Sequence, residues 1–166
     1  DFWVTAHLEQ YFNLHKNIKF GLEIEGVNNW TNRFYSNYTA TVLNAPIYQP
    51  FPESRTHLYT EYASHGYLGV GAKLVTPIRP NIDLRGELYL FRPTVLIEQS
   101  NTKEAVYNYD VKFQNYGYMI SAKVVFHSPI GPLALAANYY DAELPNNPWS
   151  ISINYGYILF NRRFIK

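Results

Sequence analysis

Apolar and polar residues alternate with a period of two along most of this chain. Because successive side chains of a β-strand point to opposite sides, this period is typical of strands whose two faces meet different surroundings. The clearest case is 82–91, where isoleucine and leucine alternate with aspartate, arginine, glutamate and tyrosine. The seven predicted strands are 2–14, 18–27, 68–75, 82–91, 116–127, 133–140 and 149–160.

The two faces of these strands differ in side-chain size as well as polarity. The polar faces hold the charged residues and are rich in Gly, Ser and Ala, while the apolar faces carry Tyr and Trp near the strand ends. A transmembrane barrel has this arrangement, with lipid outside and aromatic girdles at both interfaces. The outside of a soluble barrel is normally rich in Lys and Glu, so the pattern favours a membrane barrel. The predicted girdle residues are Tyr118, Tyr139, Trp149, Tyr155 and Tyr157.

Short and long connections alternate between the predicted strands. The short ones are 15–17, 78–81 and 128–132, and the longer or more irregular ones are 28–65, 94–114 and 142–148. Outer-membrane barrels alternate short periplasmic turns with long outer loops. We therefore expect an antiparallel up-and-down barrel in the bacterial outer membrane with its C-terminus on the periplasmic side.

The number of strands raises a question of completeness. Bacterial single-chain barrels have even strand counts, and lipid does not tolerate an open sheet edge. Either 28–65 contains an eighth strand, placed at Tyr35 to Val42, or the chain belongs to a larger barrel. The N-terminus lacks the basic start and apolar core of a signal peptide, so we expect it to be processed or internal to a longer protein.

Composition narrows the remaining classes. The 166 residues suit a single domain, 1–166, and the absence of cysteine excludes disulfides and thiolate chemistry. A net charge of +1 offers no electrostatic case for nucleic acid. The densest apolar run, Leu133 to Ala137, is far shorter than the roughly 20 residues of a membrane-spanning helix. Aromatic residues make up 17% of the chain and charged residues 16%. Girdles of aromatic side chains at the membrane interfaces would account for this high aromatic content.

The turn at 127–133 (HSPIGPL) carries a resemblance. Together with the strand 133–140 it resembles the penultimate hairpin of the BamA-type superfamily of 16-stranded outer-membrane barrels, whose turn motif here comprises Ser128, Pro129, Gly131 and Pro132. The resemblance implies that 149–160 is the closing strand, that 2–14 is the tenth, and that 28–65 is the sixth loop, folded into the lumen. It also implies a C-terminal assembly signal, for which Phe160 and Phe164 are the candidates.

A second and closer resemblance lies in the long loop and the last strand. The segments 36–41 (SNYTAT), 45–56 (APIYQPFPESRT) and 149–162 (WSISINYGYILFNR) are similar to the C-terminal barrel of Bacteroidetes patatin-like phospholipases. Those proteins carry a periplasmic patatin lipase domain, a POTRA-like linker and this barrel. The resemblance implies a membrane anchor for a lipid acyl hydrolase domain that is not present in this chain.

The superfamily holds its sixth loop through an arginine that bonds to the inner wall. Its V-R-G-F/Y motif is not present here in that form, and Arg33 and Arg55 are the two candidates. We favour Arg55, with Glu87 or Asp83 as its partner, because a guanidinium held by a carboxylate in a partly dehydrated lumen fixes a loop well. That Arg55 is merely a solvated loop residue is an equally weighted alternative.

The chain offers no catalytic motif. It has no G-x-S-x-G nucleophile elbow, and we interpret the spacing of Ser54 and His57 as chance, so we expect no catalysis by this chain. The five histidines show no H-x-x-x-H or H-x-H spacing, so we expect neither metal nor cofactor. His7 and His127 fall on the predicted lumen wall.

Two features of the polar face bear on the lumen. We interpret the glycines at 69, 71 and 117 as serving strand curvature in preference to making room for a loop. The lumen charges nearly balance, which suits a plugged barrel better than an ion-selective channel. These charges are Glu9, Lys19, Glu23, Glu25, Lys73, Asp83, Arg85, Glu87 and Lys123.

Three functional hypotheses follow. The first is an outer-membrane module that anchors, and displays or translocates, a patatin-like domain; the second is an assembly or secretion barrel of the BamA type. The third is a complete eight-stranded porin-like or lipid-binding barrel. The expected partners are outer-membrane lipid, the barrel assembly machinery during insertion, and the rest of its own barrel or a second copy.

Overall fold

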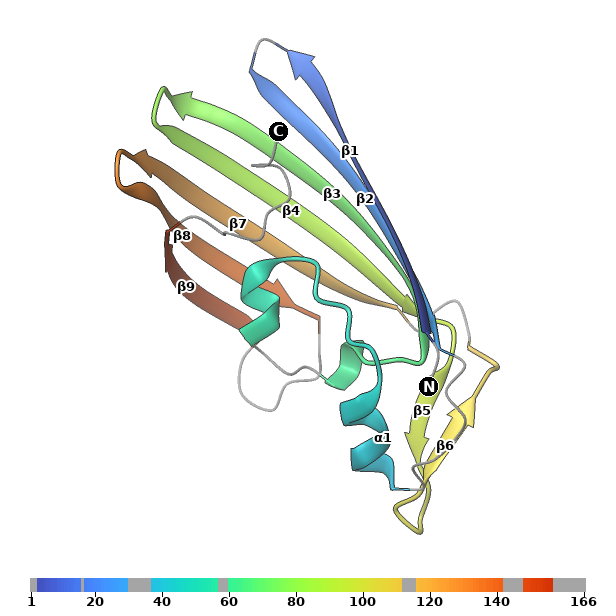
Figure 1. Ribbon diagram of the computed structural model, residues 1–166. Coiled ribbons are helices and arrows are strands. Elements are labelled where there is room, and N and C mark those ends of the chain that lie inside the picture. Colours follow the sequence, from blue (N-terminus) through green and yellow to red (C-terminus); the bar gives the residue numbers. More distant parts are fainter. Residues whose placement is uncertain are drawn as a thin grey trace.

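The computed structural model of the protein describes residues 3–15, 17–29, 37–56, 60–111, 116–141 and 148–156, without the side chains of 55, 56 and 60. Seven antiparallel strands form one twisted sheet in chain order (Figure 1). They are β1 (Trp3–His15), β2 (Ile18–Asn29), β3 (Gly66–Arg79), β4 (Ile82–Pro93), β7 (Gly117–Ser128), β8 (Gly131–Tyr140) and β9 (Trp149–Tyr155).

Each of the seven predicted strands corresponds to one of these strands. The all-β, antiparallel up-and-down architecture is therefore confirmed. Neighbouring strands pair over ten or more positions from β1 to β8, and β8 pairs with β9 over seven. The alternation of side chains makes this register specific, since a slip by one residue would exchange the two faces.

The connections divide between the two ends of the sheet. The short ones join β1 to β2, β3 to β4 and β7 to β8 at the end that we call the turn end. At the β7–β8 turn, Ser128 Oγ donates to the carbonyl oxygen of Gly131. The φ of Gly131 is 133°, a conformation that glycine adopts easily and other residues rarely do. The opposite, loop end carries the long connections, including a hairpin that the sequence pattern does not predict, formed by β5 (Leu96–Gln99) and β6 (Ala105–Asn108).

The long connection between β2 and β3 contains helices. They are α1 (Tyr38–Asn44) and two short 3-10 helices, η1 (Pro52–Thr56) and η2 (Thr60–Tyr62). The eighth strand placed at Tyr35 to Val42 is wrong, because α1 occupies its described part from Tyr38 onward. The physical reason is local: Asn37 caps the helix, its Oδ1 accepting from the Ala40 N–H at 3.2 Å.

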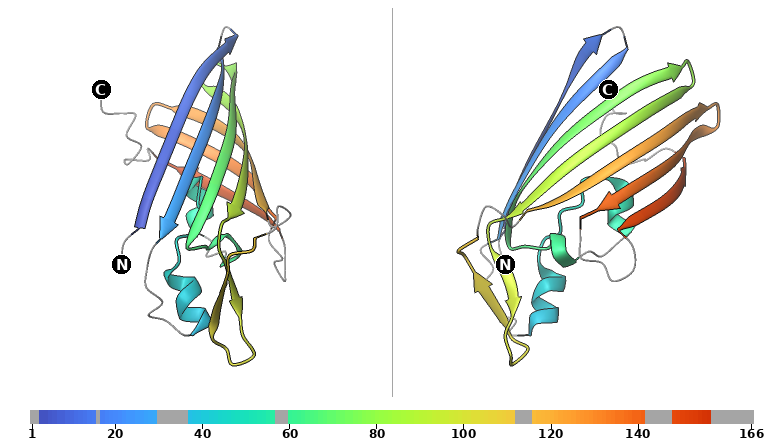
Figure 2. Two further views of the ribbon diagram at one scale, coloured as in Figure 1. Left: turned by 90° about the vertical axis from the view of Figure 1, so that its right-hand side faces the viewer. Right: turned by 180° about the vertical axis from the view of Figure 1, so that it is seen from behind.

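The sheet has two open edges among the described residues. β1 pairs only with β2 and β9 only with β8, so the first and last strands lie at opposite ends of the strand order. The sheet is curved and does not close on itself (Figure 2). Within the described ranges, no helix is long and apolar enough to cross a membrane.

The two faces of the sheet differ sharply in exposure. One, which we call the aliphatic face, exposes its leucine, isoleucine and valine side chains, for example 46% of Leu90 and 74% of Ile153. The other, which we call the covered face, buries residues of β2, β3, β4, β7 and β8 beneath the described part of the segment 45–64. The aliphatic face includes Leu22, Ile24, Leu68, Val70, Leu74, Leu84, Leu88, Leu90, Ile120, Val124, Phe126, Leu133, Leu135, Ile151 and Ile153.

Candidate functional site

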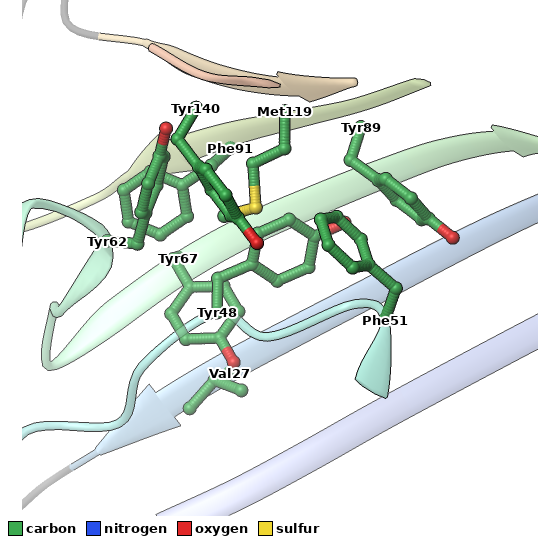
Figure 3. Packing of buried hydrophobic residues seen from close by; sticks show 9 residues of the cluster. All are labelled: Val27, Tyr48, Phe51, Tyr62, Tyr67, Tyr89, Phe91, Met119 and Tyr140. Atoms are coloured by element: carbon green, nitrogen blue, oxygen red, sulfur yellow. The ribbon is translucent and has the colours of Figure 1, made fainter. Parts of the chain in front are cut away.

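The described part of the segment 45–64 packs through aromatic side chains onto the covered face (Figure 3). Phe51 lies between Tyr89 and Tyr140, with ring centroids 5.5 and 5.9 Å away. Tyr48 stacks on Phe91 at 5.8 Å. Offset and edge-to-face contacts of this kind stabilise an aromatic cluster beyond the area it buries. The cluster comprises Val27, Tyr48, Phe51, Tyr62, Tyr67, Tyr89, Phe91, Met119 and Tyr140.

Two wall glycines make the close approach of this segment possible. The ring of Tyr48 lies directly against Gly69, and the ring of Tyr62 lies against Gly117, so that a Cβ on either glycine would meet the ring. The interpretation that these glycines serve curvature alone is therefore wrong: the missing side chains leave the space that the loop rings occupy. At Gly71 the neighbouring ring belongs to Tyr89 of the wall itself.

Polar contacts hold the C-terminal end of the segment. The Tyr62 hydroxyl donates to the Tyr118 carbonyl oxygen at 3.1 Å. Ser64 Oγ lies 2.6 Å from the carbonyl oxygen of Gly66 and 2.7 Å from that of Val95. Burial raises the pKa of the Tyr48 hydroxyl, and the carboxylates of Glu23 and Glu25 raise it further, so this phenol stays neutral.

A buried ion pair joins the segment to the wall. The Lys123 ammonium on β7 lies 3.0 Å from Glu53 of η1 and 3.3 Å from Glu87 of β4. Glu53 also accepts a hydrogen bond of 2.7 Å from the Asn154 amide on β9. Only 7% of Glu53 and 8% of Lys123 is exposed. Because a buried charge is costly without a partner, this pair ties the position of η1 to three wall strands.

The predicted arginine contact falls on residues that the structure does not describe. Arg33 and the side chain of Arg55 both lie outside the described residues, so the arginine contact stays a prediction. The contact that is described has the opposite polarity, with a loop carboxylate, Glu53, on a wall cation, Lys123. Glu87 forms an ion pair with the same Lys123. Asp83 lies near the turn end, where it contacts His127 at 2.7 Å and Arg85 at 3.5 Å.

A second ion network lies on β1, β2 and β3. The Lys73 ammonium lies 2.8 Å from Glu9 and also contacts Glu23. His7 Nδ1 lies 3.4 Å from Glu25 and 3.8 Å from Glu23, and ligand atoms of these three residues fall within 4.8 Å of one another. We interpret the group as an ion-pair network, because Lys73 already supplies a cation to it.

Sequence spacing missed this network for a physical reason. His7 lies opposite Glu25 in the β1–β2 register, and Glu23 lies opposite Glu9. Motif searches along the chain detect ligands on one helix or turn, whereas these side chains come together across strands. The signal that was available is the run of charged residues at alternate positions of 18–27, facing the only histidine of 2–14.

Three of the predicted girdle residues form an aromatic row at the loop end. Tyr118 stacks on Tyr139 at 5.7 Å, and Trp149 meets Tyr139 edge-on at 5.0 Å. Tyr155 lies at the turn end and donates to the Ile130 carbonyl oxygen at 3.2 Å. Tyr157, Phe160 and Phe164 lie outside the described residues.

Of Ser54 and His57, the structure describes Ser54. Ser54 is buried, and its hydroxyl donates to the Phe51 carbonyl oxygen at 2.6 Å, while His57 lies outside the described residues.

Comparison with protein-family models, with curated proteins and with solved structures finds no match for this chain. Any statement of function therefore rests on its own sequence and geometry.

Proposed function

We propose that this chain is roughly half of an outer-membrane β-barrel that anchors an attached domain and is itself no enzyme. The observation that carries the proposal is the inverted distribution of side chains on the sheet. The aliphatic face is exposed, whereas charged residues such as Glu23 and Lys123 are buried on the covered face. A soluble β-sandwich buries its apolar faces instead.

The size of the aliphatic face supports lipid as its surroundings. Exposed aliphatic and aromatic side chains continue from β1 to β9 across all seven strands. Soluble monomers rarely expose a contiguous apolar patch above a few hundred Å². Hydrocarbon would cover this surface at no cost, and the row of Tyr118, Tyr139 and Trp149 suits the membrane–water interface.

The open edges support a larger barrel. Unpaired N–H and C=O groups on β1 and β9 would be costly in lipid. Further strands of the same protein, as in the 16-stranded superfamily that the turn motif resembles, would pair with both edges. A second copy of the chain is the competing source of strands. A complete eight-stranded barrel is disfavoured by α1, which replaces the strand that such a barrel needs.

The covered face supports a plugged lumen in preference to a channel. Aromatic rings, two fitted glycines and the Glu53–Lys123 pair hold the segment 45–64 on the wall. A barrel filled in this way serves as an anchor. We propose that it carries a patatin-like lipid acyl hydrolase, and that it displays or translocates this domain.

An assembly or secretion barrel of the BamA type is the second candidate. The Ser128–Gly131 turn and the wall-bound loop favour it equally, because both belong to that superfamily as a whole. The region before Asp1 separates the two candidates. A G-x-S-x-G motif between a strand and a helix favours the phospholipase, and tandem POTRA repeats alone favour the assembly barrel.

The membrane proposal is tested on the complete protein that contains this chain. We expect it to fractionate with outer membranes, to require detergent for extraction, and to migrate faster on a gel before boiling than after it. A protein that stays in aqueous solution without detergent, with one mobility in both lanes, would overturn the proposal.

A further inference from the structure

The aliphatic face contains one conspicuous exception. We consider the described strand residues whose side chains point to the aliphatic face, leaving out those beyond the bulges at the turn end. Among them, the one charged residue is Arg92 on β4. Arg92 is exposed and lies opposite Leu68 of β3 in the register. A cation on a lipid-facing strand is costly at mid-membrane but costs little near the interface, so its depth matters.

The register places Arg92 at the interface. Leu90 lies opposite Tyr118, the first member of the aromatic row, and Arg92 is two residues closer to the loop end. From Ile82 to Arg92 there are ten residue steps, which span about 33 Å along a strand and roughly 25 Å across a membrane at the usual tilt. This height matches the apolar band of an outer-membrane barrel, so Arg92 stands at the level of lipid headgroups.

A groove opens beside this guanidinium. It has a volume of about 320 Å³ and lies where the chain after β6 passes the loop ends of β3 and β4. Its apolar floor at Leu68 continues into the aliphatic face at Val70 and Leu90. The residues that line it are Leu68, Arg92, Pro93, Thr94, Tyr109 and Val111.

On the basis of the proposed membrane function, we propose that this groove binds one anionic phospholipid at the loop-end leaflet. The phosphate pairs with the Arg92 guanidinium, and an acyl chain lies along Leu68 and Val70. The planar guanidinium matches a phosphate with two parallel hydrogen bonds, which favours arginine over lysine at such a site. Tyr109, 65% exposed at the rim, places its ring at the headgroup level.

Charge complementarity and continuity identify the occupant. Among the described residues that line it, the groove joins one cation, Arg92, to an aliphatic surface, and a lipid with a phosphate headgroup and an acyl chain is complementary to both parts at once. A free phosphate ion would use the guanidinium alone, and an acidic loop of another protein would leave the aliphatic floor uncovered.

The proposal is tested by native mass spectrometry of the complete protein in detergent, titrated with dimyristoyl phosphatidic acid or dimyristoyl phosphatidylcholine. We expect the wild-type protein to prefer phosphatidic acid, and Arg92→Gln to weaken that binding about tenfold. Arg92→Lys should lose less. Arg79→Gln, which removes an exposed arginine at the turn end, is the matched control and should bind as the wild type does.

The outcomes separate this inference from the membrane proposal. Equal binding by wild type and Arg92→Gln, or no preference for phosphatidic acid, would overturn the lipid site. If heat-modifiable migration is retained in the same protein, the barrel proposal still holds. Complete displacement of the lipid by millimolar inorganic phosphate would assign the groove to free anions and would also overturn it. Loss of heat-modifiable migration in the wild type would instead contradict the barrel itself.

Discussion

The same seven strands present two faces that are stabilised in different ways. On the aliphatic face, side chains such as Leu88 and Ile153 are exposed. On the covered face, Lys123, Glu53 and Asn154 satisfy one another, and Tyr48 and Tyr62 fit onto glycines. We expect the aliphatic face to tolerate other apolar residues, whereas the covered face depends on specific partners. The two faces should therefore respond differently to substitution.

The largest effect is expected where a buried charge loses its partner. Lys123→Ala leaves the Glu53 and Glu87 carboxylates buried without their cation, at a cost of about 3–5 kcal/mol. We expect faster proteolysis within 45–64 and a lower temperature for loss of heat-modifiable migration. The double variant Lys123→Met with Glu53→Gln also removes the Glu53 charge and should recover the part of the loss that Glu53 causes, while Glu87 keeps its hydrogen bond from the Tyr89 hydroxyl. Wild-type cleavage of Lys123→Ala would contradict a role for the pair.

A charge on the aliphatic face should act on insertion. Leu88→Arg puts a guanidinium near the middle of the lipid-facing surface, at a cost of about 2–4 kcal/mol. We expect less protein in the membrane fraction, measured by immunoblot after carbonate extraction. Leu43→Arg, at an exposed position of α1, is the control and should insert normally. Equal insertion of both variants would show that lipid does not surround the aliphatic face.

A methyl group at a fitted glycine should displace the loop. In Gly69→Ala the new Cβ meets the ring of Tyr48, and overpacking of this kind costs about 1–3 kcal/mol. We expect increased protease access to 45–64 without loss of the barrel's heat-modifiable migration. Gly86→Ala is the matched control, since a Cβ there meets no atom within 4 Å. If both variants behave alike, the glycine does not position the ring.

The smallest effect is expected from pH at the junction of loop and sheet. Burial lowers the pKa of His65, whose Nδ1 lies 3.1 Å from the Asn29 amide. The unfolded chain then takes up a proton before the folded one, so the contribution of this residue is complete above the unfolded pKa and decreases as the pH falls below it. We expect proteolysis of the loop to increase modestly as the pH falls from 7 to 5. In His65→Gln the rate of proteolysis should no longer depend on pH in this range.

Much of the strand pattern was accessible from the sequence because each strand has two different environments. The seven segments were recognised from alternation alone, whereas Gly69 and Gly117 were noticed on the polar face but wrongly interpreted as serving curvature. The helix α1 was misread as a strand because a seven-residue segment carries too few periods to distinguish the two. The capping residue Asn37 was the overlooked signal.

The partners on the covered face were beyond the reach of the sequence. Glu53 and Lys123 are 70 positions apart, and Asn154 reaches Glu53 from the last strand. Nothing local marks Glu53 as a residue that contacts the wall. The β1–β2 register, and not residue spacing, likewise joins His7 to Glu25.

The sequence by itself determined the seven strands of the main sheet, their up-and-down order and the separation of the two faces, since a period of two is a local property of an extended chain. Only the tertiary structure decided how the segment 45–64 packs on the covered face, which charge meets Lys123, and where Arg92 lies relative to the aromatic row. These depend on the register between strands and on how a long loop folds back, which are set by packing between residues far apart in the chain.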